Sequence, residues 1–246
     1  MHVLITGAAG YLGHGLVHAF AGHHTLRLLD VTAYDGPVDH EMIVGSVADY
    51  ATVASAVEGI DALVIAHMAS RKPGAYDTPV QAFDINVKGT ANLYHAAARA
   101  GIKRVSLISS IGVVQPHVKK GVFLSRDLPR LGTEPYGLSK ILQETIAEQY
   151  HAGHGIASAM IRPAYITDQS TQADKYGKVF KEVNWQYIDR RDIGQAARLA
   201  LDVPDLGCEA FYTLGHPSAE SRADIAYTRQ RLGWKPEYDF TAFPAT

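Results

Sequence analysis

The sequence predicts an α/β fold: a Rossmann-like, doubly wound parallel sheet with a small C-terminal lobe, in one domain over residues 1–246. Short apolar, β-branched runs alternate with helical segments, which is the pattern of right-handed βαβ crossovers. A glycine-rich turn follows the first apolar run directly and marks the first strand-to-helix junction. The 246 residues, of which 47% are hydrophobic, suffice for one large core.

The expected strands and helices alternate along most of the chain. Apolar runs predict strands over residues 2–6, 25–30, 41–44, 61–66, 103–109, 156–161 and 209–214. Helices are expected over residues 11–21, 50–58, 79–100, 136–151, 190–202 and 222–232. Two longer segments, 111–135 and 163–188, begin where an expected strand ends, so we expect them to shape a binding pocket. Asp192 is expected to cap the helix over 190–202.

Composition and charge argue against several classes of function. The net charge of −2 does not provide the basic face that nucleic acids or membrane surfaces require. No apolar run approaches the ~20 residues of a membrane helix. The N-terminal residues show no signal peptide and Cys208 is the one cysteine, so we expect a cytoplasmic protein whose cysteine serves packing. The histidine pairs lack further ligands at metal-binding spacing, so no metal is expected.

Residues 6–13, TGAAGYLG, have the spacing that a dinucleotide pyrophosphate requires. Gly7 allows a tight turn, Gly10 lets the backbone approach a phosphate, and Gly13 lets the next helix pack close to the sheet. The N-terminus of that helix supplies free N–H groups and a partial positive charge. Asp30 ends the second strand, where a carboxylate accepts hydrogen bonds from ribose hydroxyls and repels a 2′-phosphate. These residues predict NAD as the cofactor in preference to NADP.

Tyr136 and Lys140 form a YxxxK motif at the start of an expected helix. Residues four apart lie on one helical face, so the phenol and the ammonium can point into the same cleft. The ammonium and the positive charge of an oxidised nicotinamide both favour the phenolate, so Tyr136 can take a hydroxyl proton while a hydride leaves the carbon. Ser110, at the end of the preceding strand, is placed to hydrogen-bond the reacting oxygen. The three residues are our catalytic candidates.

Together these motifs resemble the extended short-chain dehydrogenase/reductase family, in its NAD-dependent epimerase/dehydratase group. The resemblance covers nearly the whole chain, and it adds five segments to the glycine loop and the catalytic candidates: residues 66–69 (AHMA), 86–90 (NVKGT), 162–163 (RP), 191–193 (RDI) and 232–236 (LGWKP). The chain departs from the family at Ser46, where an acid is usual, and at 113–115 and 164–168. The last two departures fall in the expected substrate pocket.

The resemblance also implies a set of cofactor contacts along the carboxyl edge of the sheet. Those positions are Gly7, Ala9, Gly10, Tyr11, Leu12, Gly13, Asp30, Ser46, Val47, Ala66, His67, Met68, Asn86, Ile108, Tyr136, Lys140 and Pro163. The chain is short for this group, and the segments left for a substrate lobe are about 163–188 and 215–246. A small lobe indicates a small substrate.

The length and the C-terminal tail resemble the uronate dehydrogenases, which oxidise a free sugar acid at C1. The candidate substrate contacts are Ser70, Arg71, Ser110 and Lys175, with Lys72 and Lys178 as further cations for a carboxylate. The leading hypothesis is therefore an NAD-dependent oxidoreductase that transfers a hydride between nicotinamide and a hydroxyl or carbonyl carbon of a free sugar or sugar acid.

Two alternatives remain. One is an NAD-dependent nucleotide-sugar epimerase or dehydratase, which the short lobe disfavours. The other is a non-catalytic NAD-sensing protein, which has no need of the base that Tyr136 offers. In this family the helices over 79–100 and 136–151 form a dimeric four-helix bundle, so a homodimer is expected; the alternative is that both helices only pack on the sheet.

Overall fold

The computed structural model describes residues 1–69 and 76–244. Its main sheet has seven parallel strands in the order β10-β6-β5-β4-β1-β2-β3. The predicted doubly wound fold is thereby confirmed, with every expected strand within a few residues of its observed bounds. These are β1 (His2–Thr6), β2 (Thr25–Asp30), β3 (Glu41–Val44), β4 (Ala62–Ile65), β5 (Arg104–Ile108), β6 (Ala157–Pro163) and β10 (Cys208–Thr213).

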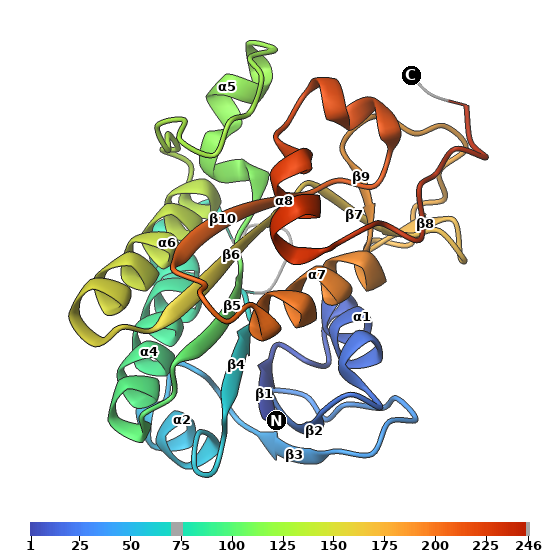
Figure 1. Ribbon diagram of the computed structural model, residues 1–246. Helices are drawn as coiled ribbons and strands as arrows, with labels where there is room; N and C mark the ends of the chain where they lie inside the picture. Colours follow the sequence, from blue (N-terminus) through green and yellow to red (C-terminus); the bar gives the residue numbers. More distant parts are fainter. Residues whose placement is uncertain (70–75, 245–246) are drawn as a thin grey trace.

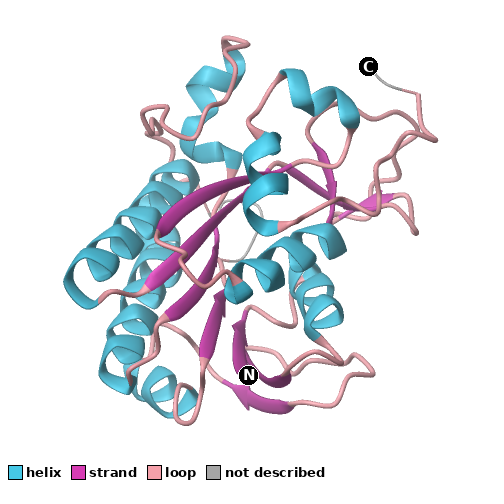
Figure 2. Ribbon diagram, in the orientation of Figure 1, coloured by secondary structure: helices cyan, strands magenta, loops and turns pink. Residues whose placement is uncertain are grey.

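Helices cover both faces of this sheet (Figures 1 and 2). One face carries α2 (Tyr50–Ala56), α4 (Lys88–Ala100) and α6 (Pro135–His154), and the other carries α1 (Tyr11–Phe20) and α7 (Arg190–Asp202). Side chains of β1 alternate between the two layers: Val3 and Ile5 pack into the core with α1 and α7, and Leu4 packs into the other. Burial on both faces explains why the central strands are mostly apolar. Among the described residues, no helix is long and apolar enough to cross a membrane.

The expected helix over 79–100 is interrupted. A short α3 (Pro79–Gln81) leads into a π-helical segment, η1 (Ala82–Val87), before α4 begins. The wide turn contains Asn86, whose side-chain oxygen accepts a hydrogen bond from the Ala69 N–H at 2.7 Å and whose amide donates to Ser139 Oγ at 2.9 Å. Such π-bulges commonly occur at functional sites. Here the bulge joins α6 to the segment that follows β4.

The two long segments also contain regular structure. Residues 111–135 include a 3₁₀ turn, η2 (Ile111–Val114), and the short helix α5 (Gln115–Lys119). Residues 163–188 contribute to a second, three-stranded sheet of order β8-β7-β9, in which β7 pairs with β8 antiparallel and with β9 parallel. Its strands are β7 (Tyr165–Asp168), β8 (Ala173–Asp174) and β9 (Tyr187–Asp189).

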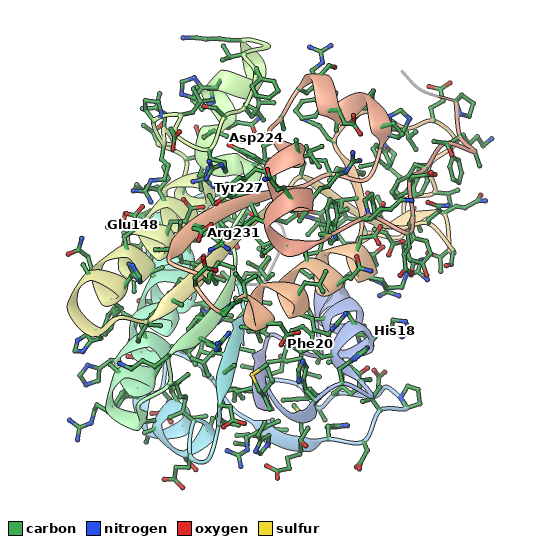
Figure 3. The ribbon with its side chains drawn as sticks, viewed as in Figure 1. His18, Phe20, Glu148, Asp224, Tyr227 and Arg231 are labelled. Carbon is green, nitrogen blue, oxygen red and sulfur yellow. The ribbon has the colours of Figure 1, made fainter. Side chains whose placement is uncertain are left out.

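The C-terminal tail contains η3 (Pro217–Ser221) and α8 (Ile225–Leu232). Figure 3 shows Tyr227 and Arg231 on α8 and Asp224 directly before it, and α8 packs beside the edge strand β10 (Figure 1). Arg231 bonds Glu209 of β10 at 3.0 Å, and the Tyr227 hydroxyl donates to the same carboxylate. These contacts fasten the tail to the sheet.

The cap expected at Asp192 is made by another residue. Asp189 precedes α7 and accepts the Arg191 N–H at 2.9 Å. Asp192 lies inside the first turn with 1% of its surface exposed, and its carboxylate accepts the N–H groups of Glu237 at 2.8 Å and Tyr238 at 3.1 Å. The expectation was wrong because a carboxylate can satisfy backbone donors far away in the chain as readily as those of its own helix.

Candidate active site

A cavity of about 610 Å³ opens at the carboxyl ends of the central strands. It lies where the strand order reverses between β1 and β4, which is where ligands bind in open α/β sheets. Fifteen of the residues expected at the cofactor, the catalytic centre or the substrate line it. They are Gly7, Ala9, Gly10, Tyr11, Leu12, Gly13, Asp30, Ala66, Met68, Ile108, Ser110, Tyr136, Lys140, Pro163 and Lys175.

The glycine loop has little room for side chains. Gly7 has φ +72°, and a Cβ placed there would lie 2.8 Å from the Cα of His67. A Cβ on Gly13 would clash with the carbonyl oxygens of Gly7 and Ala8, so the start of α1 packs closely on the loop that follows β1. A Cβ on Gly10 would meet one atom within 4 Å, the Gly7 oxygen at 3.2 Å. Gly10 therefore leaves the space towards the cavity open, and α1 begins there without a side-chain cap.

Asp30 lies beside this loop at the end of β2. One carboxylate oxygen accepts the Ala9 N–H at 3.1 Å, and the other accepts the Thr32 N–H at 3.2 Å. A carboxylate has about four lone-pair sites, so Asp30 retains acceptor capacity towards the cavity that it lines. The two hydrogen bonds from the backbone fix the orientation of the carboxylate, so its remaining lone pairs keep a fixed direction.

A second cavity of about 380 Å³ adjoins the first and shares Gly7, Asp30, Met68 and Ala69 with it. Two adjoining cavities across the end of β1 suit the two halves of a dinucleotide. The expected residues Ser46, Val47 and His67 line the second cavity. With them lie Leu29, Val31, Gly45, Gln81, Asp84 and Ile85.

The catalytic candidates come together beside the first cavity. Lys140 is buried, and its Nζ donates to the Ile108 carbonyl oxygen at 2.8 Å. Ser110 Oγ accepts the Gly112 N–H at 3.0 Å. A Cβ placed on Gly112 would lie 3.2 Å from Ser110 Oγ and 3.4 Å from the Tyr136 ring. The serine hydroxyl and the tyrosine ring therefore flank one point, where a Cβ would be tight against the hydroxyl.

Two expected cofactor residues, Asn86 and His67, do not line the first cavity. Asn86 is fully buried and lines neither cavity; both of its side-chain groups bind protein, as described above. His67 Nδ1 lies 3.1 Å from Thr6 Oγ1, and burial lowers its pKa to about 3, so the ring is neutral. These side chains hold the segment after β4 in place.

Of the expected substrate contacts, Lys175 lines the cavity, whereas Ser70, Arg71 and Lys72 lie outside the described residues. Lys178 is exposed and is absent from the lining. The sequence reasoning missed Tyr176 and Ile166, which lie on the wall that the three-stranded sheet supplies. Their places depend on that sheet, for which the chain shows no periodic signal. Among the described residues, no group of three candidate metal ligands occurs.

The lobe and the glycine loop are joined directly. The Tyr11 hydroxyl donates to the Ala173 carbonyl oxygen of β8 at 2.9 Å. The Arg190 guanidinium lies 4.8 Å from the Tyr11 ring centre and pairs with Asp168 of β7 at 2.7 Å. Tyr11 and Arg190 thus connect the glycine loop to the three-stranded sheet, which forms the cavity wall near Lys175.

The sequence and the fold of this chain are similar to those of known NAD-dependent enzymes. A model of the NAD dependent epimerase/dehydratase family matches residues 3–202. The chain is 34% identical over 221 residues to a uronate dehydrogenase of Pseudomonas syringae pv. tomato, covering 85% of this chain and 73% of that protein. It is 24% identical over 256 residues to an L-arabinose 1-dehydrogenase (NAD(P)(+)) of Haloferax volcanii, covering 95% of each. A solved uronate dehydrogenase from Agrobacterium tumefaciens superposes with a TM-score of 0.75 at 25% identity, over 98% of this chain and 86% of that one.

Proposed function

The chain belongs to the NAD dependent epimerase/dehydratase family, and from that premise we propose that it is an NAD-dependent oxidoreductase acting on a free sugar or sugar acid. The observation that carries the proposal is a single cavity lined by the glycine loop and by Ser110, Tyr136 and Lys140. A protein that only senses NAD would need the glycine loop but not the three catalytic candidates. The second part provides a base, an ammonium and a hydroxyl where a substrate would meet the cofactor.

The residues fit NAD. Gly7, Gly10 and Gly13 form a cradle that Cβ atoms would fill, and the N-terminus of α1 offers N–H groups to a pyrophosphate. Asp30 would accept hydrogen bonds from the adenosine ribose and would repel a 2′-phosphate, which favours NAD over NADP. When bound, the nicotinamide supplies the hydride acceptor.

In the proposed mechanism the protein holds the reacting hydroxyl and removes its proton. Ser110 Oγ hydrogen-bonds the substrate oxygen and orients it towards Tyr136. Lys140 favours the phenolate form of Tyr136, which takes the proton as the carbon gives up its hydride. In the reverse direction Tyr136 returns the proton to the forming alkoxide. Pro163, which lines the cavity, would pack against the nicotinamide.

We propose a small, acidic substrate for this site. Lys175 supplies a cation on the cavity wall, and a cation suits the carboxylate of a sugar acid. The relatives named uronate dehydrogenase and L-arabinose 1-dehydrogenase support a free sugar. An epimerase or dehydratase of a nucleotide sugar is the second candidate, which the family description favours.

The proposal is tested by nicotinamide absorbance with NAD and a panel of uronic acids, aldoses and polyols. Reduction of NAD with a uronic acid or an aldose is expected. No reduction across the panel would refute the dehydrogenase and favour the nucleotide-sugar alternative, to be tested by product analysis. Tyr136→Phe is expected to lower kcat by about 10²–10⁴-fold, the range of general acid–base catalysis; full turnover in this variant would refute the mechanism.

Lys175 and Lys178 offer a matched pair of variants, because both lie in the same lobe and one alone lines the cavity. Lys175→Ala is expected to raise KM for a uronic acid about 10-fold or more, with little effect on an uncharged aldose. Lys178→Ala is expected to change neither. Equal KM values for the two variants would remove Lys175 from the substrate site.

Three further proposals follow from the sequence. We propose one domain over residues 1–246, a homodimer formed through α4 and α6, and a cytoplasmic location. Light scattering of the purified protein tests the dimer, and the mass of a single chain would refute it.

A further inference from the structure

A carboxylate lies behind the catalytic candidates, buried in the protein. Glu144 is on α6, one helical turn after Lys140 and two turns after Tyr136, so the three residues follow one helical face. Its side chain is fully buried. Both carboxylate oxygens accept hydrogen bonds from the Arg162 guanidinium at 2.8 Å, and one of them also accepts the Ser109 hydroxyl at 2.6 Å.

Two partners of Glu144, Ser109 and Arg162, come from the ends of β5 and β6 at the cavity. Ser109 follows β5 and precedes Ser110 directly, and its own N–H donates to the Ile161 carbonyl oxygen of β6 at 2.7 Å. Arg162 lies in β6, directly before the cavity residue Pro163. One carboxylate therefore joins α6, β5 and β6 at the level of the active site.

The charges around this carboxylate form a short chain to the surface. Arg130 reaches Glu144 at 3.5 Å and Glu148 at 2.9 Å, and Glu148 is the part-exposed end of the chain on α6 (Figure 3). The Tyr212 hydroxyl lies 3.3 Å from Arg162. Burial alone would disfavour the charge of Arg162, but the bonds to Glu144 raise its pKa above the ordinary value.

A buried ion pair is weak evidence for stability, since apolar residues of similar volume commonly stabilise a fold as well. The ion pair instead fixes the position of the Glu144 carboxylate relative to the end of β5. Lys140 Nζ bonds the carbonyl of Ile108, and Glu144 bonds the side chain of Ser109. Two successive residues of one strand end are thus held by two successive turns of α6.

We infer that Glu144 is a positioning residue for the reaction proposed above. Arg162 holds the carboxylate, and the carboxylate holds Ser109. By holding Ser109, the carboxylate fixes the position of the next residue, Ser110, relative to the Tyr136 side chain. The inference rests on the proposed function, because it assigns Glu144 a role in the same site.

The test compares two buried serines of one strand segment. Ser109→Ala removes the bond to Glu144 and keeps both charges of the ion pair. Ser106→Ala is the matched control: Ser106 is also fully buried in β5, and its Oγ donates to the Ala197 carbonyl oxygen at 2.7 Å, in α7 and away from the cavity. Each variant loses one buried hydrogen bond, but the Ser109 bond ends on a carboxylate and the Ser106 bond on a neutral carbonyl. Ser109→Ala is therefore expected to lose about 1–2 kcal/mol more stability than Ser106→Ala, and kcat of each variant is compared at a temperature where both are folded.

For Ser109→Ala, kcat is expected to fall about 10-fold to 100-fold, the effect of a small misplacement of a reacting group, with the dissociation constant for NAD unchanged. Ser106→Ala is expected to keep kcat within about twofold. Ser109→Thr, which retains the hydroxyl, is expected to restore most of the lost kcat. The inference is overturned if Ser109→Ala keeps its kcat, or if the two alanine variants lose kcat equally.

Crystal structures of both alanine variants provide a readout that needs no activity. The Ser110 Oγ to Gly112 N bond of 3.0 Å is expected to be lost or lengthened in Ser109→Ala and kept in Ser106→Ala. If the wild-type protein reduces no NAD, the proposed function fails, and these structures still decide the inference. An unchanged Ser110 in Ser109→Ala would overturn it.

Discussion

The buried carboxyl of Asp192 makes a quantitative prediction about stability and pH. Burial raises its pKa to about 7, although the N–H groups of Glu237 and Tyr238 oppose the shift. In the unfolded chain an aspartate titrates near ~3.9. Between these two values the unfolded state has released the proton and the folded state has kept it. The unfolded state therefore binds fewer protons, and the free energy of unfolding falls as pH rises from about 4 to about 7.

The magnitude follows from the size of the shift. Each pKa unit corresponds to about 1.4 kcal/mol, so three units predict a loss of about 4 kcal/mol across this pH range. Asp192→Asn removes the titration and keeps a carbonyl oxygen for one of the two backbone donors. The variant is therefore expected to lose stability relative to the wild type at pH 4 and to recover relative to it by pH 7.

Urea denaturation followed by tryptophan fluorescence, at pH 4 to 8, measures the difference. The other titrating groups are common to both proteins, so their contributions cancel in the comparison. Asp205→Asn is the control, because the hydrogen bond from Arg231 lowers the pKa of this exposed carboxyl, so its contribution changes below pH 4. Parallel stability curves for the wild type and Asp192→Asn would show that Asp192 does not titrate with a raised pKa in the folded protein.

Three further predictions concern the site. Gly7→Ala places a Cβ at positive φ, 2.8 Å from the His67 backbone, and is expected to weaken NAD binding about 10-fold or more in a fluorescence titration, from ~1–2 kcal/mol of backbone strain; unchanged affinity would contradict the cradle. Tyr11→Phe loses the bond to β8, worth about 1 kcal/mol, and is expected to raise the sugar KM about fivefold; an unchanged KM would show that this bond does not position the cavity wall. Glu144→Gln leaves a buried arginine unpaired and is expected to cost about 3–5 kcal/mol in urea denaturation, whereas a loss below 1 kcal/mol would show that water or another group compensates the charge.

The positions of the strands and their burial on both faces could be predicted from the sequence because they depend on local pattern. The alternation of Val3, Leu4 and Ile5 between two cores needs only a period of two and helices on both sides. The conformation of the glycine loop could likewise be predicted from its residues, since the positive φ at Gly7 and the close contact at Gly13 exclude side chains. Tyr136 and Lys140 are four residues apart, so the helical repeat places them on one face of α6.

Contacts between distant segments were the part that the sequence did not reveal. The π-helical turn at Asn86 depends on partners at Ala69 and Ser139. The three-stranded sheet that carries Tyr176 towards the cavity depends on pairing between segments far apart in the chain, which has no signature in periodicity.

Local patterns in the chain therefore predicted the strands and helices of the doubly wound sheet, the nucleotide loop, and the pair Tyr136 and Lys140, because each pattern repeats within a few positions. Which carboxylates cap helices and which join separate elements depends on contacts that form on folding. Asp189, Asp192 and Glu144 look alike in the chain, and each sits in or beside a helix. They differ in the donors that folding brings to them: the start of their own helix, the C-terminal tail, and two strand ends at the active site. A buried carboxylate takes its role from whichever donors replace water around it.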